Sequence, residues 1–109
     1  MTDADKLVLG SVAFLALMHA LDGVTSQLGI NVGAIERNFF MATADGISWK
    51  NFLVIKCLHT GMFAGFSALI LKLTRSAELA ALPAILQGAS VGMASVSNLV
   101  VMFAHLGWL

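Results

Sequence analysis

Three long apolar stretches occupy most of this chain of 109 residues, and they restrict it to folds that suit a lipid bilayer. They run from about residue 7 to 28, from 49 to 73 and from 83 to 108. A helix of about 20 apolar residues crosses a hydrocarbon core about 30 Å thick, so each stretch is long enough to span it. Because backbone polar groups find no water in hydrocarbon, these stretches are predicted to be helices.

The composition agrees with this prediction, since 59% of the residues are hydrophobic and only 11% are charged. Soluble domains average about 25% charged residues. The net charge is zero, so no basic surface for nucleic acid is expected. The sequence therefore predicts an all-α integral membrane bundle of three transmembrane helices, folded as a single domain over residues 1–109.

The segment from about residue 30 to 47 is predicted to be a short interfacial helix between the first and second spans. It mixes an apolar set of residues with a polar set: Val32, Ile35, Phe39, Phe40 and Met41, then Glu36, Arg37 and Asn38. A helix with one apolar side can lie in the membrane interface, and the segment is too short for another helical hairpin. A plain loop is the alternative.

Two boundaries carry recognisable signals. Ser48 is a suitable N-cap for the second span, and Trp49 suits a membrane interface. Pro83 allows two interpretations of the third span. It is either the first-turn proline of a helix or a proline inside a longer helix that begins near Ser76 and Glu78.

Asp22 and Lys56 are the only charged residues deep inside the apolar stretches. A charge at mid-membrane costs about 2.5–3.5 kcal/mol on insertion scales, so it usually has a partner or a function. Lys56 lies seven residues beyond Trp49, and Asp22 lies six residues before Leu28. Both are therefore about 10 Å from the same membrane surface at 1.5 Å per residue. Antiparallel neighbouring helices would bring them into one layer.

Three more polar residues fall near this depth. His19 and His59 form a second predicted layer, three residues deeper than the charged pair, and Asn98 lies at nearly the same depth. Glu36 is a further partner for Lys56 if the connecting helix dips inward. The cluster is interpreted as a structural group that sets helix register. The alternative is a proton or ion relay, or a counter-ion for a ligand.

Haem is a third interpretation of the histidines, because b-type haems in membrane bundles take a histidine from each of two helices. A haem- or quinone-binding anchor subunit is therefore kept beside a simple packing role for His19 and His59. The chain has no phosphate loop, no HExxH, no GxSxG and no clustered cysteines. We accordingly expect no catalytic residue, no enzyme activity and no metal site, and the cofactor is left open.

Two small-residue motifs indicate close helix packing. Gly61 and Gly65 form a GxxxG motif in the second span, and Gly88 and Gly92 form another in the third. Glycine at this spacing lets helix backbones approach closely inside a membrane. Each motif can serve the bundle itself or a neighbouring subunit.

From Leu21 the chain reads LDGVTSQLGINVGAIERNFF, followed later by the intramembrane Lys56. This region resembles an uncharacterised family of small polytopic prokaryotic membrane proteins. Their pattern is DxxT at the end of the first span, then GAxExNP, then a lysine in the next span. The matching residues are Asp22, Thr25, Gly33, Ala34, Glu36, Asn38 and Lys56. Phe39 stands where the pattern has proline. The resemblance covers about a third of the chain. It implies a membrane bundle with an Asp/Glu/Lys cluster, in a prokaryotic inner membrane, and it implies no substrate.

The expected function is that of a structural or accessory subunit of a larger membrane assembly, or of a homo-oligomer. Its partners would be the lipid bilayer and either other membrane subunits or copies of itself. A virion membrane protein belongs to the same class. The alternatives are a small proton- or ion-coupled transporter and a haem- or quinone-binding anchor subunit.

Overall fold

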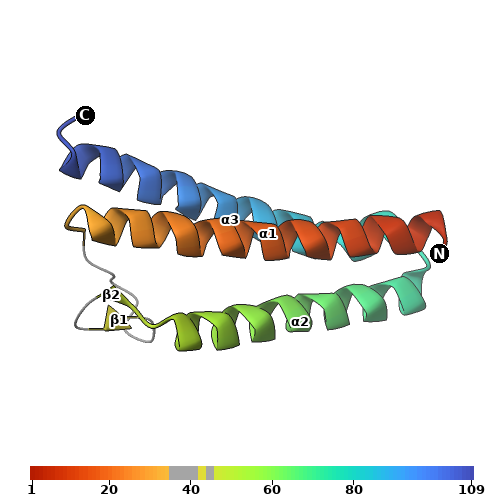
Figure 1. Cartoon of the computed structure of the whole chain (residues 1–109). Helices are drawn as coiled ribbons and strands as arrows, with labels where there is room; N and C mark the ends of the chain where they lie inside the picture. Colours follow the sequence, from red (N-terminus) through yellow and green to blue (C-terminus); the bar gives the residue numbers. More distant parts are fainter. Residues whose placement is uncertain (35–41, 44–45) are drawn as a thin grey trace.

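Three long helices form nearly the whole molecule in the computed structural model, which describes residues 1–34, 42–43 and 46–109. They are α1 (Asp3–Asn31), α2 (Trp49–Thr74) and α3 (Ala77–His105), shown in Figure 1. All three are long and apolar enough to cross a membrane. The predicted helices are therefore confirmed, and the three candidate spans indicate a multi-pass membrane protein.

Serine hydroxyls begin two of these helices. Ser48 Oγ accepts a hydrogen bond from the Asn51 N–H at 3.3 Å, and Ser76 Oγ accepts one from the Leu79 N–H at 3.2 Å. Each bond occupies a backbone donor that the first turn of a helix leaves unpaired. Because α3 begins just after Ser76, Pro83 lies inside it and the longer-helix alternative is correct. The third helix thus spans residues 77–105 rather than 83–108.

The connection between α1 and α2 contains a small antiparallel ladder. Its strands are β1 (Ala42–Thr43) and β2 (Gly46–Ile47). Half of the interfacial helix predicted over about residues 30–47 falls on residues 35–41 and 44–45, which lie outside the described part of the chain. The described remainder of that segment holds the end of α1, a turn and the ladder.

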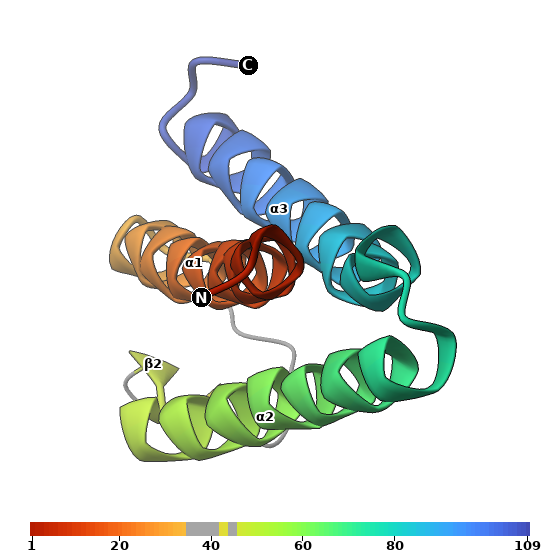
Figure 2. The same cartoon turned by 90° about the vertical axis from the view of Figure 1, so that its right-hand side faces the viewer.

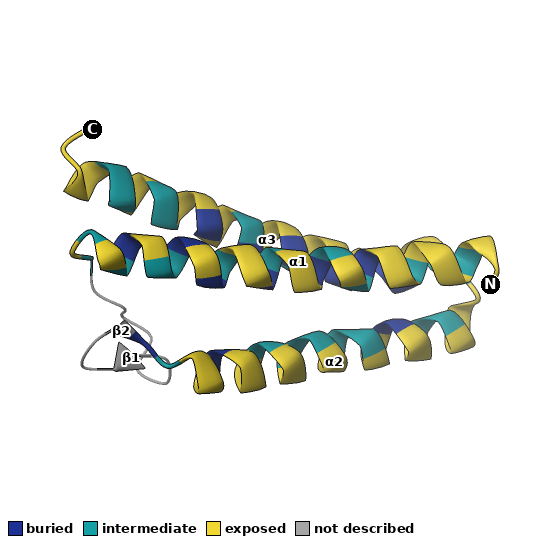
Figure 3. Ribbon diagram, viewed as in Figure 1, coloured by how far each residue is buried: buried dark blue, intermediate teal, exposed yellow. Residues whose placement is uncertain are grey.

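Helices α1 and α3 run in the same direction and lie side by side, while α2 runs back beside them (Figures 1 and 2). Most of the buried residues of α1 and α3 recur every three or four positions, which is the period of one helix face. Figure 3 shows how different α2 is, because most of its surface is exposed. Its only buried residues are Phe52 and Ser67.

The close contact between α1 and α3 depends on the glycines of α3. A Cβ atom built at Gly88 would stand 2.6 Å from the Phe14 ring, and one at Gly92 would stand 3.1 Å from the Met18 sulfur. Real Cβ atoms essentially never come within 3.0 Å of another atom, and the contact at Gly92 is tighter than nine in ten real ones. The GxxxG motif of α3 is therefore used inside the bundle, where it lets α1 lie against the helix backbone.

The GxxxG motif of α2 has a different environment. A Cβ atom at Gly61 or at Gly65 would meet no atom of the described structure within 4 Å, apart from its own helix. These two glycines therefore take no part in the packing of the three helices.

Replacing Gly88 with alanine is expected to destabilise the protein relative to the same replacement of Gly61. Alanine is about 1 kcal/mol more favourable than glycine inside a helix, so both changes gain this term. Only Gly88→Ala also forces the Phe14 ring aside, which costs about 1–3 kcal/mol. Unfolding titrations in detergent micelles, followed by helix content, measure the difference. Equal stabilities would contradict the close approach of α1 and α3 at Gly88.

Candidate functional site

The two charged residues of the spans lie together in the structure. Lys56 Nζ of α2 is 3.4 Å from Asp22 Oδ2 of α1, and the two side chains are only 20% and 19% exposed. The Lys56 ammonium also lies 5.7 Å from the centroid of the Phe52 ring. A cation over an aromatic face gains electrostatic attraction, so Phe52 supports the position of the ammonium.

Asn98 connects α3 to the same carboxylate. Its Nδ2 lies 3.0 Å from Asp22 Oδ1, from Thr25 Oγ1 and from Ser26 Oγ. An amide nitrogen carries two hydrogens, so these acceptors share them. The Thr25 hydroxyl donates its own hydrogen to the Leu21 carbonyl at 2.8 Å, which leaves its oxygen free to accept. One carboxylate oxygen of Asp22 therefore pairs with Lys56 of α2, and the other accepts a hydrogen bond from Asn98 of α3.

The histidines form the neighbouring layer. His19 Nε2 and His59 Nδ1 are 2.7 Å apart, and the two rings meet edge to face with centroids 4.7 Å apart. His59 also lies against Phe63, at 4.9 Å between ring centroids. His19 is 4% exposed, and its Nδ1 has no hydrogen-bond partner within the described structure. One hydrogen bond between the rings thus joins α1 to α2.

The contact between Gly23 and Phe52 was not predicted from the sequence. Gly23, next to Asp22, lies under the Phe52 ring, because a Cβ atom there would stand 2.5 Å from the ring. Only a glycine allows this approach of α2 to α1. A glycine directly beside an intramembrane charge could have indicated a close helix contact. It could not have indicated which residue packs on the glycine. Ser26 was also missed as a partner of Asn98, because its position in the sequence does not show which helix it faces.

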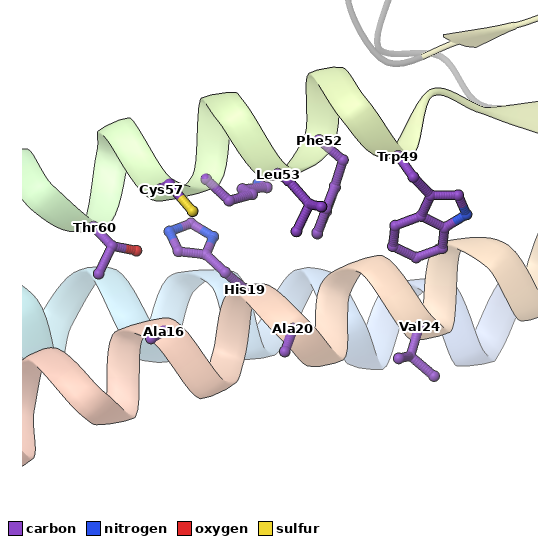
Figure 4. A pocket seen from close by; sticks show the side chains of 10 residues that line it. Ala16, His19, Ala20, Val24, Trp49, Phe52, Leu53, Cys57 and Thr60 are labelled. Atoms are coloured by element: carbon purple, nitrogen blue, oxygen red, sulfur yellow. The ribbon is translucent and has the colours of Figure 1, made fainter.

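A cavity of about 440 Å³ lies between α1 and α2, beside the polar cluster (Figure 4). Its wall is mostly apolar, and the rings of Trp49 and Phe52 meet edge to face in it at 5.3 Å between centroids. The lining residues are Ala16, His19, Ala20, Val24, Trp49, Phe52, Leu53, Lys56, Cys57 and Thr60. The polar cluster therefore borders a space large enough for a small molecule.

Glu36 is the remaining residue predicted for the cluster, and His105 was not predicted to belong to it. Glu36 lies outside the described part of the chain, so its position relative to Lys56 is not defined. His105, the third histidine, is exposed near the end of α3 and its Nδ1 lies 2.9 Å from the Val101 carbonyl. The structure thus brings together Asp22, Lys56, Asn98, His19 and His59.

The histidine geometry does not fit a haem held between the two rings. A metal–histidine bond is about 2 Å long, so two nitrogens on opposite sides of one iron would be about 4 Å apart. His19 Nε2 and His59 Nδ1 are instead 2.7 Å apart and bonded to each other. The haem interpretation would require the rings to separate.

The fold and the cluster indicate a class, a bundle of three candidate membrane-spanning helices whose polar groups pair between helices. The comparisons go no further: no protein-family model, no curated protein and no solved structure matches the chain.

Removing one charge of the pair is expected to lower the free energy of unfolding more than removing both charges. Lys56→Met or Asp22→Asn alone leaves one charge unpaired, at a cost of about 2.5–3.5 kcal/mol on insertion scales. The double variant leaves no charge, so a double-mutant cycle of unfolding free energies should give a coupling of about 1–3 kcal/mol. Additive effects of the two substitutions would show that the pair does not contribute to stability.

Proposed function

We propose that this chain is a structural membrane subunit that acts by packing its second helix against another transmembrane helix, most simply that of a second copy. The observation that carries the proposal is the exposed GxxxG motif of α2, whose Gly61 and Gly65 meet nothing in the described structure. The corresponding motif of α3 is occupied by α1.

The surroundings of these glycines support the proposal. Residues at helical spacing around Gly61 and Gly65 are large, apolar and exposed, and they form one stripe along α2: Leu58, Met62 and Leu69. Lipid tails are as apolar as leucine, so exposed leucines alone do not indicate a partner. Glycines flanked by larger residues form a groove, and such a groove favours another helix because its backbone can approach closely.

The polar cluster also fits a structural role. Lys56 and Asn98 each contact Asp22, and the two histidines contact each other. Paired groups of this kind hold the register of neighbouring helices, which is a well-attested use of buried polar residues. A bundle held internally in this way leaves the exposed side of α2 available for assembly.

The double variant Gly61→Leu/Gly65→Leu is expected to weaken association of the full chain in lipid nanodiscs or micelles. Filling the groove should cost about 1–3 kcal/mol, or roughly a tenfold or greater loss of affinity. Counting subunits by single-molecule photobleaching measures the effect. Gly10→Leu is the matched control, because a Cβ atom at Gly10 also meets nothing within 4 Å and this glycine belongs to neither motif. If both variants associate like the unmodified chain, α2 is not the assembly face.

A proton relay is the second candidate, and the bond between the histidine rings favours it. His19 and His59 share one hydrogen at 2.7 Å, in the layer next to the pair of Asp22 and Lys56. Histidine exchanges protons near neutral pH, and chains of ionisable groups inside membranes carry protons in pumps and transporters.

Proton flux into liposomes that contain the purified chain tests the relay. We expect His59→Phe to abolish any flux that a pH-sensitive dye records, because the bond between the rings is lost. His105→Phe is the control, since His105 is exposed and distant from the cluster along α3. Flux that survives His59→Phe, or that is absent from the unmodified protein, removes this candidate.

A further inference from the structure

We propose that the cavity between α1 and α2 binds the head of a membrane-dissolved quinone, a flat, neutral ring that carries carbonyl oxygens. This inference is independent of the packing role proposed above, because the cavity and the glycine stripe use different residues of α2.

The size and walls of the cavity suit such a ring. Its volume of about 440 Å³ falls within the range of small-molecule sites, about 300–1,000 Å³. Figure 4 shows the side chains of Trp49, Phe52 and Leu53 reaching from α2 toward Ala20 and Val24 of α1. Aromatic side chains pack well against a flat ring in offset or edge-to-face geometry. The small Ala20 leaves the space that such a ring would fill.

One polar group on the wall, the ammonium of Lys56, can donate a hydrogen bond to a ligand. Lys56 has three ammonium hydrogens, and the carboxylate of Asp22 is its only ion-pair partner in the described part of the chain. His19 also lines the cavity, but its Nδ1 is covered by the protein and does not open on this space. A carbonyl oxygen of a quinone would accept a hydrogen bond from Lys56.

The charge of the wall selects a neutral ligand over a fatty acid. The carboxylate of Asp22 already neutralises Lys56, and no other lysine or arginine lines the cavity. A carboxylate ligand would therefore meet the negative charge of Asp22 without a free cation to balance it. A plain hydrocarbon chain would offer no acceptor to the ammonium hydrogens of Lys56 that Asp22 does not take, which is unfavourable in an apolar space. A neutral ring with carbonyl groups brings no negative charge near Asp22 and offers an acceptor to Lys56.

Trp49 reports on the site directly. The chain has two tryptophans, so a Trp108→Phe background leaves Trp49 as the only one. The full chain in phosphatidylcholine nanodiscs would be titrated with decylubiquinone while tryptophan fluorescence is recorded. We expect saturable quenching, because the quinone ring would lie against Trp49.

The matched variants test the location. Ala20→Phe should fill the cavity and weaken decylubiquinone binding about tenfold or more. Ala13→Phe should leave binding unchanged, because Ala13 is exposed on the same helix and does not line the cavity. Circular dichroism checks that each variant folds, and Ala16→Phe, also in the cavity wall, replaces Ala20→Phe if that variant does not.

The controls separate ring recognition from partitioning. Decylbenzene, which has the same tail length and no carbonyl, should not displace decylubiquinone. Equal displacement by decylbenzene would overturn the carbonyl assignment. Quenching that rises linearly with quinone content, and that Ala20→Phe leaves unchanged, would overturn the site.

Discussion

The carboxylate of Asp22 is the point at which the three helices meet. One of its oxygens faces Lys56 of α2, and the other accepts from Asn98 of α3. An ionised group in apolar surroundings is costly unless it is paired, so losing either contact would destabilise the bundle. Helices that each expose a single polar group to lipid would be unfavourable, whereas the assembled bundle pairs them. The relative depth of the three helices follows from this one group.

The two sides of α1 use different means of attachment. Toward α3, close packing dominates, because Gly88 and Gly92 allow Phe14 and Met18 to lie against the helix backbone. Toward α2, a few specific contacts dominate: the ion pair, the bond between the histidine rings and the Phe52 ring over Gly23. Such contacts fix register but do not fill space. A cavity between α1 and α2 and an exposed outer face of α2 are the consequences, and both proposals rest on them.

The depth of the polar residues could be predicted well from the sequence. The rise of a helix is constant and the apolar stretches mark where the membrane begins, so counting residues placed Asp22 opposite Lys56 and His19 opposite His59. The start of α3 was left between two interpretations, because proline is compatible with both the first turn and a helix interior. The packing of Phe52 on Gly23 and the role of Ser26 were missed. Those contacts depend on how each helix is rotated about its axis, and near-uniform apolar helices carry little signal of rotation.

The sequence by itself determined that the chain forms three apolar helices and at what depth its charges lie, because both follow from local composition and a fixed helical rise. Only the tertiary structure decided which of the two GxxxG motifs is occupied inside the bundle and which faces outward. It alone showed that a cavity lined by Lys56 and His19 borders the polar layers. The physical reason is that two motifs with the same glycine spacing both permit close packing, and only the rotation and approach of neighbouring helices decide which of them is used.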